Sequence, residues 1–431
     1  MNSFDDILFL FTTTPAGLGH IRVMDAIKDA RPGHITSVDL GILDIKANRI
    51  HDLGSRVKFF VKLTEFYQTN KIAEAIVTAI YTLYLRRHTK NIIEEFTKIQ
   101  EKYPNQKKWV VISTHFALAH SASSAKKYLE QKFGIKIYLC VIVTDDSPQK
   151  VWAVSGSDLT FVPSINTKTK LENFLPKEKQ DSIKAISFPI ASRLSQSLTT
   201  NEFQFVINQL NPNISSVSSN VTQIEIPVSG AAVQLDFFQK FIEKLCRENY
   251  SFTVIGQESM LTKMFFENIQ RLPRVQLSIG TDSWQTVKFY ESLFYQPNRP
   301  SIEITKPSEQ AFKAILNPRQ RGGVILLLTK PIGRQEYDNL NFLERFGLVP
   351  TKEEHNMLFQ EPNLRRWSEK AKSWRAVRIP DDPIKAAEFV KNLKASGILY
   401  SMLSCIVPDK EELKTNGVDR IWEEIGKLLV G

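Results

Sequence analysis

Several features are scarce in this sequence of 431 residues. It contains only three cysteines, Cys140, Cys246 and Cys405, whose wide spacing matches neither a zinc site nor a redox pair and therefore favours a reducing compartment. No apolar run is long enough to span a bilayer, and no basic region precedes the short apolar run near the N-terminus. We therefore expect neither a transmembrane helix nor a signal peptide. The chain also lacks a short-period internal repeat.

The composition is that of a soluble globular protein, with 42% hydrophobic and 24% charged residues. The length predicts two domains of roughly 200 residues each. A formal charge of +10 favours contact with an anionic partner, which could be nucleic acid, a phosphorylated substrate or an acidic membrane surface. Because the basic residues are scattered and form no stripe, we do not expect nucleic acid to be that partner.

A glycine-rich turn near the N-terminus is the first candidate site. Residues 7–11 are an apolar run typical of a buried parallel strand, and residues 21–27 have helical apolar spacing, so Gly17, Gly19 and His20 lie in the turn between them. Backbone N–H groups at such a helix start attract anions, and the glycines allow a ligand to approach closely. His20 could accept a proton from a hydroxyl. Alternatively, the glycines only form a tight turn, and His20 packs against the first helix.

Polar residues follow the next predicted strands of the first half as well. The strand that begins at residue 109 ends in Ser113-Thr114-His115, and the strand that begins at residue 137 ends in Thr144-Asp145-Asp146. Trp152 and a short strand over 159–162 come next. Ligands gather at the carboxyl ends of parallel strands, so His20, His115 and Asp145 or Asp146 are predicted to meet at one edge. A helix-capping role for Ser113 and Thr114 is the alternative.

The second half repeats this organisation, so we predict an α/β protein with two doubly wound domains. A strand over 224–228 leads into Ser229-Gly230-Ala231-Ala232 and a helix over 235–245, which makes a second candidate phosphate site. Later strands are predicted at 252–256, 275–279 and 323–328, and residues 300–311 are predicted to be a strand followed by a polar loop that opens a helix. The predicted domains are 1–195, a linker over 196–222 that contains one helix, 223–400, and a helical tail over 401–431.

Two basic and aromatic regions allow more than one interpretation. Residues 57–90 place aromatic side chains beside Lys and Arg, which fits either peripheral membrane contact or ordinary helices with a solvated basic face. Trp367 and Trp374 lie among basic residues from Arg365 to Arg378. We interpret this second region as a surface helix, with nucleic-acid stacking as the alternative.

The order of these motifs resembles the two-domain GT-B glycosyltransferases, in particular the monogalactosyldiacylglycerol synthases and the bacterial N-acetylglucosaminyltransferase of peptidoglycan lipid synthesis. Gly17-Leu18-Gly19-His20 is similar to the family's Gly-x-Gly-His loop. The lipid-sugar synthases have a series of Ser-Thr-His, Thr-Asp, Trp and Val-Pro-Ser motifs, which is similar to Ser113-Thr114-His115, Thr144-Asp145-Asp146, Trp152 and 161–164 here. In the second half, the residues similar to donor-site loops are Ser229, Gly230, Ala231, Ala232, Lys306, Ser308, Glu309, Gln335, Glu336 and Asn339.

The resemblance implies two Rossmann-like domains that face each other across a cleft. It implies inverting transfer of a sugar from a nucleotide diphosphosugar, such as a uridine diphosphosugar, to a hydroxyl of a lipid or lipid-linked acceptor in glycolipid synthesis at the cytoplasmic membrane face. His20, or alternatively Asp145 or Asp146, would be the base, while Gly17, Gly19, Ser113, His115 and Trp152 would bind the acceptor. No cofactor or metal beyond the donor substrate is expected, and no Asp-x-Asp motif is present.

The sequence also departs from the family pattern. Ser308 replaces a glycine, and Lys313-Ala314 stands where a Glu-Ala pair usually holds the ribose of the nucleotide. Glu309 or Glu336 could substitute for that glutamate. The alternatives are therefore a nucleotide-sugar 2-epimerase of the same architecture and a catalytically silent GT-B-like protein that binds a nucleotide or a membrane.

Overall fold

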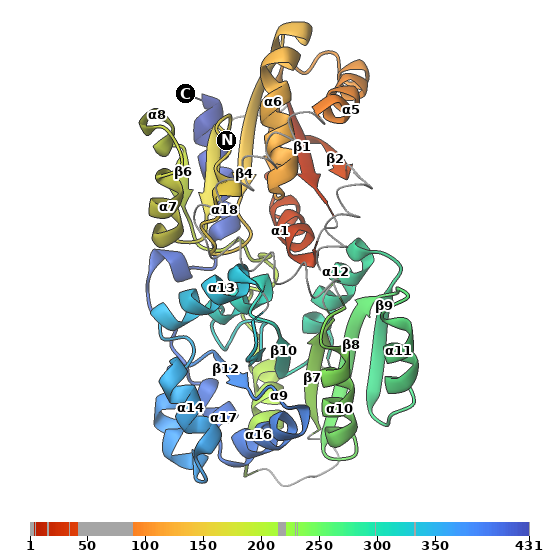
Figure 1. Ribbon diagram of the computed structural model, residues 1–431, viewed down its shortest axis with the longest axis vertical. Coiled ribbons are helices and arrows are strands. Elements are labelled where there is room, and N and C mark those ends of the chain that lie inside the picture. The colour runs from red at the N-terminus through yellow and green to blue at the C-terminus, as the bar shows by residue number, and fades with distance from the viewer. Residues whose placement is uncertain are drawn as a thin grey trace. The chain divides into compact units, whose positions relative to one another are not determined.

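The computed structural model describes residues 4–430 except 5, 15–16, 34, 42–88, 214–220, 229, 231, 298 and 332. The chain divides into two compact units, drawn in Figure 1. The first comprises Met1–Ser192 with Lys414–Gly431, and the second comprises Arg193–Leu413. Residues 57–88 of the predicted membrane-contact region lie outside the described residues.

The first unit contains a parallel six-stranded sheet with the order β2-β1-β3-β4-β5-β6. Its strands are β1 (Ile7–Thr13), β2 (Thr36–Gly41), β3 (Lys108–Ser113), β4 (Lys136–Ile142), β5 (Leu159–Val162) and β6 (Ile183–Ala185). Its helices are α1 (Leu18–Asp29), α5 (Thr89–Lys102), α6 (Phe116–Phe133), η1 (Lys150–Trp152), α7 (Ile165–Glu172), α8 (Lys177–Gln180) and α18 (Gly417–Val430). Every residue of β1 is buried, as expected for an inner strand of a sheet that is covered on both faces.

Helix α18 returns from the end of the chain to the first unit. The Trp422 indole N–H donates to the Ile27 carbonyl at 2.9 Å, and its ring lies 5.5 Å from that of Phe9. A Cβ atom at Gly417 would lie 2.2 Å from the Ser187 carbonyl oxygen, so only glycine fits at the start of this helix. The sequence instead suggests a separate tail over 401–431. The difference arises because the apolar face of α18 is covered by residues from the other end of the chain.

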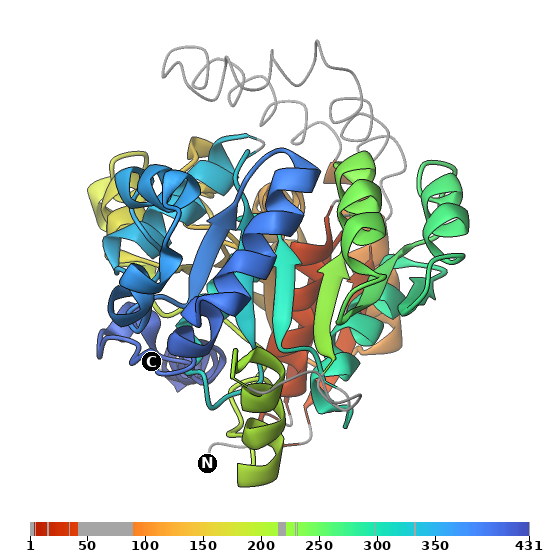
Figure 2. The same cartoon turned by 90° about the horizontal axis from the view of Figure 1, so that it is seen from below.

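The second unit has a parallel sheet with the order β12-β11-β10-β7-β8-β9. Its strands are β7 (Thr222–Pro227), β8 (Tyr250–Gln257), β9 (Val275–Gly280), β10 (Ile302–Thr305), β11 (Val324–Leu328) and β12 (Ala376–Ile379). The first helices are α9 (Thr200–Leu210), α10 (Leu235–Leu245), α11 (Lys263–Ile269), α12 (Ser283–Ser292), η2 (Leu293–Tyr295), η3 (Glu309–Ile315) and α13 (Arg334–Arg345). The later ones are α14 (Lys352–Gln360), η4 (Leu364–Trp367), α15 (Ser368–Ala371), α16 (Pro383–Ala395), α17 (Ile398–Met402) and η5 (Glu411–Leu413). Helices α10 and α16 pack side by side on one face of this sheet (Figure 2).

The two sheets confirm the predicted α/β fold class with two doubly wound domains. Two segments differ from the sequence interpretation. The helix expected within the linker is α9, but its Phe203, Val206 and Leu210 pack into the core of the second unit. The predicted surface helix is confirmed over 364–371, where η4 and α15 expose Arg365, Arg366 and Lys370, but residues 376–379 form the buried edge strand β12. Trp374 and Arg375 are both buried. The mixture of basic and aromatic residues in this segment of the sequence does not indicate that burial.

The strand orders locate the point in each sheet where a ligand is expected. In both sheets the strand order reverses between two neighbouring strands, β1 and β3 in the first unit and β7 and β10 in the second. In open parallel sheets, ligands bind beyond the carboxyl ends of such a strand pair. The loops after these four strands carry the predicted residues Gly17 to His20, His115, Gly230, and Lys306 to Glu309.

Candidate functional site

His20 lies in the first turn of α1, beyond the end of β1. Helix α1 begins after Gly17, whose φ of 146° is a conformation that side-chain-bearing residues rarely adopt. Gly19 is part of the same first turn. The Thr114 hydroxyl lies 3.0 Å from the His20 carbonyl oxygen and 2.9 Å from the Thr13 hydroxyl, so it ties the start of α1 to the ends of β1 and β3. The position of His20 is therefore fixed by its backbone.

The ring of His20 is also held by the strand end after β4. Its Nδ1 atom lies 3.2 Å from the Thr144 hydroxyl oxygen. That hydroxyl lies 3.4 Å from an Asp145 carboxylate oxygen, to which it can donate. If the Thr144 proton points to Asp145, then Thr144 accepts from His20 Nδ1–H, and the lone pair of the imidazole is on Nε2. This chain of three groups favours the tautomer that a general base at Nε2 requires.

An aromatic cluster surrounds His20. The ring of His115 is 5.0 Å from that of His20, and it stacks on Phe116 at 4.7 Å. Trp152 meets Phe116 edge to face at 5.5 Å and lies 6.3 Å from His20. The structure thus brings His20, His115, Asp145 and Trp152 together. Sequence reasoning missed Phe116, although its position directly after His115 was the available signal.

Asp146 and Ser113 point into the protein from the same edge. The Asp146 carboxylate is buried and accepts from the Ser164 hydroxyl and, at 2.7 Å, from the Thr167 hydroxyl. Ser164 in turn caps α7 by accepting from the Thr167 backbone N–H. The Ser113 hydroxyl donates to the His115 carbonyl at 3.0 Å. These contacts favour a structural role for both residues, so Asp145 is the better placed carboxylate.

In the second unit, the loop between β7 and α10 has an unusual backbone. Ser229 and Ala231 lie outside the described residues, and Gly230 is exposed. Ala232 and Gln234 have φ values of 50° and 64°, which side-chain-bearing residues adopt at some cost. Two such residues in one short loop are a feature of functional sites, although they do not identify the ligand.

The other predicted donor residues surround the loop after β10. Lys306 forms an ion pair with Glu336, and the Asn339 side-chain amide donates to the Pro307 carbonyl at 3.3 Å. Ser308 and Glu309 are partly exposed at the start of η3, and Gln335 is partly exposed in the first turn of α13. The structure therefore brings Lys306, Glu336 and Asn339 into contact. Because Glu336 offsets the charge of Lys306, this edge is less positive than the sequence suggests.

Lys313, which stands where the family pattern has a glutamate, is turned inward. Its ammonium group pairs with the carboxylate of Glu303, and both side chains are buried. The same ammonium lies 4.1 Å from the ring centre of Tyr290 and 3.9 Å from that of Phe294. The Tyr290 hydroxyl donates to Glu303 at 2.9 Å. Lys313 thus belongs to a buried ionic cluster that anchors η3 to β10.

The helices at the candidate edges share one property. Within the described residues, the N-cap positions of α1, α6, α10 and α13 make no side-chain capping hydrogen bond. By contrast, side chains cap α7, α9, α12, α14 and α16. An uncapped helix start presents backbone N–H donors and a positive dipole end to an anion. In the same part of the chain, the N-caps of α8, α11, α15 and α17 also lack a side-chain hydrogen bond, so this property alone does not distinguish the candidate edges.

In the part of the chain that the structure describes, no group of three or more His, Cys, Asp or Glu side chains is arranged to hold a metal ion. Among the helices in that part of the chain, none combines the length and apolar character needed to cross a bilayer.

Comparison with known proteins agrees with the fold. No protein-family model and no curated protein sequence matches the chain. The UDP-GlcNAc 2-epimerase of Neisseria meningitidis bound to UDP-GlcNAc is 12% identical, with 98% of this chain and 99% of that chain covered and a TM-score of 0.51. The Staphylococcus aureus MnaA–UDP structure is 10% identical, with 98% and 96% covered and a TM-score of 0.48. MurG of Acinetobacter baumannii is 9% identical, with 98% and 99% covered and a TM-score of 0.43.

At this level of identity, the likeness to the Neisseria structure establishes the fold alone. This chain has the two Rossmann-like domains of the GT-B class, as the motif resemblance predicts.

Proposed function

We propose that this chain is a glycosyltransferase that moves a sugar from a nucleotide diphosphosugar to an acceptor hydroxyl. The observation that carries the proposal is the His20–Thr144–Asp145 chain at the strand-order reversal of the first sheet. Its support from the second unit is the position of the α10 and α13 N-termini and of the Lys306 loop, which follow strands of the second sheet near its own strand-order reversal.

In this proposal, His20 Nε2 removes the proton of the acceptor hydroxyl as that oxygen attacks the anomeric carbon. The bond from the sugar to the diphosphate breaks as the new glycosidic bond forms, which inverts the configuration. Thr144 and Asp145 keep the ring in the required tautomer and stabilise the imidazolium that results. His115 and Trp152 are buried beside the His20 ring, and in this proposal they hold that ring in place on the acceptor side.

The departing diphosphate needs donors that are in place before the reaction. The N–H groups at the starts of α10 and α13 supply them, and the Lys306 ammonium is available if it exchanges part of its Glu336 contact for a phosphate oxygen. With Lys313 buried, Glu309 and Glu336 are the carboxylates left near this loop for the ribose hydroxyls. The resemblance to the lipid-sugar synthases supports a lipid or lipid-linked acceptor.

A 2-epimerase is the second candidate, because the Neisseria structure with a TM-score of 0.51 is a UDP-GlcNAc 2-epimerase. An epimerase of this kind would act on the nucleotide sugar without an acceptor. A transferase requires an acceptor, and it releases the nucleoside diphosphate only as fast as it glycosylates that acceptor.

The test is a turnover assay of the full chain with UDP-GlcNAc and other nucleotide sugars, followed by NMR with and without lipid acceptors. We expect acceptor-dependent release of the nucleoside diphosphate, slowed about 10²- to 10⁴-fold by His20→Ala, the usual contribution of a general base. His355→Gln is the matched control, since that imidazole lies in the second unit, hydrogen-bonded to Thr351 and Arg378. An acceptor-independent change at C2 would support the epimerase instead, and full activity of His20→Ala would remove His20 as the base.

A further inference from the structure

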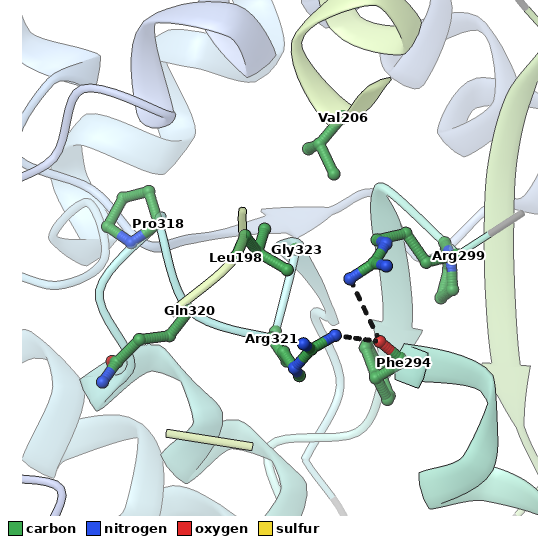
Figure 3. A pocket seen from close by; sticks show the side chains of 10 residues that line it. Leu198, Val206, Phe294, Arg299, Pro318, Gln320, Arg321 and Gly323 are labelled. Atoms are coloured by element: carbon green, nitrogen blue, oxygen red, sulfur yellow. Dashed lines mark hydrogen bonds between the residues drawn. The ribbon is translucent and has the colours of Figure 1, made fainter. Parts of the chain in front are cut away.

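The second unit contains a pocket at the sheet edge opposite its candidate donor loops. Pro300 lies ahead of β10 and Gly323 ahead of β11, so the pocket is at the amino ends of these strands. Figure 3 shows the side chains that line it. They are Leu198, Val206, Phe294, Arg299, Pro300, Pro318, Gln320, Arg321, Gly322 and Gly323.

Two arginines converge on this pocket. Arg299 is only 5% exposed, and its guanidinium contacts Glu202 and the Phe294 carbonyl. Arg321 donates to the same Glu202 oxygen at 3.1 Å. It also donates to the same Phe294 carbonyl at 3.3 Å, as Figure 3 shows. The Nε–H groups of both arginines are buried and have no hydrogen-bond partner among the described residues. A buried donor without a partner is costly, so two in one pocket call for an acceptor that is not part of the protein.

The charge of the pocket indicates what kind of acceptor this is. Glu202 is the carboxylate that the two arginines share, and it also accepts from the Thr199 backbone N–H at 2.7 Å. That backbone hydrogen bond, together with the Arg299 contact, lowers the pKa of Glu202 to about 2, so it is ionised at neutral pH. Two guanidinium charges face one carboxylate charge. The local excess is one positive charge, which favours an anion over water.

The loop that carries Arg321 is fixed by hydrogen bonds at both ends and in its middle. Arg375 is buried and donates to the carbonyls of Leu316 and Gly323, at the two ends of the loop that carries Arg321. The Gln320 side chain donates to the Ser195 carbonyl at 2.6 Å, and the Arg321 backbone N–H donates to the Leu194 carbonyl at 3.0 Å. The loop is therefore tied to residues 194–198, the first segment of the second unit.

We propose that this pocket binds a small inorganic anion, such as phosphate or chloride, through the Nε–H groups of Arg299 and Arg321. The anion satisfies both buried donors and neutralises the excess charge. It thereby stabilises the pairing between the 316–323 loop and residues 194–198, independently of any nucleotide sugar.

Thermal unfolding of the full chain tests this proposal, with sodium phosphate or sodium chloride titrated at constant ionic strength against sodium gluconate. We expect a saturable rise in Tm with at least one of the two anions, as mass action requires for a ligand of the folded state. Arg321→Gln is expected to weaken that binding about 10- to 100-fold, the loss of one charge-assisted hydrogen bond. Arg319→Gln is the matched control, because it removes the same charge from an exposed position on the same loop.

Arg321→Lys is a second variant, needed because Arg321→Gln could fail to fold. It keeps a cation beside Glu202 but removes the Nε–H group, so we expect a folded protein with weakened anion binding. A Tm that rises equally in wild type, Arg321→Gln and Arg321→Lys would place the anion elsewhere and overturn the proposal. The absence of a saturable rise in the wild type with either anion would also overturn it.

Discussion

The buried Lys313–Glu303 pair gives the sharpest stability prediction. Replacing Lys313 with Met keeps a side chain of similar length between Tyr290 and Phe294 but removes the charge. The Glu303 carboxylate then stays buried with Tyr290 as its hydrogen-bond donor. Because the Lys313 side chain is 6% exposed and that of Glu303 is 0% exposed, water cannot replace the lost partner without local opening.

The expected magnitude follows from this burial. Removing one partner of a buried ion pair typically costs about 3–5 kcal/mol, because the other charge is left uncompensated. Glu303→Gln in the same protein removes that charge and keeps an acceptor for the Tyr290 hydroxyl. We therefore expect the double variant to recover most of the lost free energy of unfolding, leaving a deficit of about 1 kcal/mol for the missing contacts with the two rings.

Urea unfolding monitored by hydrogen–deuterium exchange suits this test, because peptides from β7 and β10 report on the second unit separately from the first. Lys313→Met should lower the protection of these peptides and leave those of β1 and β3 unchanged. A free energy of unfolding for Lys313→Met within about 0.5 kcal/mol of the wild-type value would refute the reasoning, because an ordinary surface substitution has an effect of that size. So would a double variant that is less stable than the single one.

Three further predictions concern other parts of the fold. Asp146→Asn should destabilise the first unit by about 1–3 kcal/mol in urea unfolding, because both the Ser164 and Thr167 hydroxyls donate to one Asp146 oxygen, and a neutral amide oxygen accepts more weakly than a carboxylate. Burial is the main cause that lowers the pKa of His355 to about 3, so the unfolded chain binds a proton below pH 6.5 that the folded chain does not. The free energy of unfolding of the second unit should then fall by about 1.4 kcal/mol per pH unit between pH 6.5 and 3, and His355→Gln should remove this slope. Gly417→Ala should detach α18, measured as faster proteolysis of the last 15 or so residues, because its Cβ atom would meet the Ser187 carbonyl; unchanged proteolysis would show that the helix start can shift.

Sequence reasoning located the strands and turns well, because the signals there are local. The buried apolar runs at 7–11, 109–112 and 324–328 are strands in the structure, and each ends in the polar loop that the sequence indicates. Helical spacing after residue 21 and over 235–245 identified α1 and α10. The strand-order reversal, which determines where the loops meet, follows from this alternation of strands and helices.

The remaining features depend on contacts between distant residues. Nothing near Lys313 in the sequence shows that it pairs with Glu303, and nothing near Lys306 shows that Glu336 neutralises it. Asp145 and Asp146 are adjacent and chemically identical, yet only Asp146 faces the hydroxyls of α7. From the sequence, Arg375 is predicted to be a surface cation. In the structure it donates to the carbonyls of Leu316 and Gly323, which are distant in the sequence.

The central claim is that the chain binds a nucleotide diphosphosugar, and isothermal titration calorimetry tests it most directly. The full chain should be titrated with the diphosphates of uridine, guanosine, cytidine and thymidine at a fixed concentration of phosphate. The account predicts saturable binding of at least one of them, weakened by Lys306→Met and unaffected by Arg321→Gln. Failure of all four nucleoside diphosphates to bind a folded chain would contradict it.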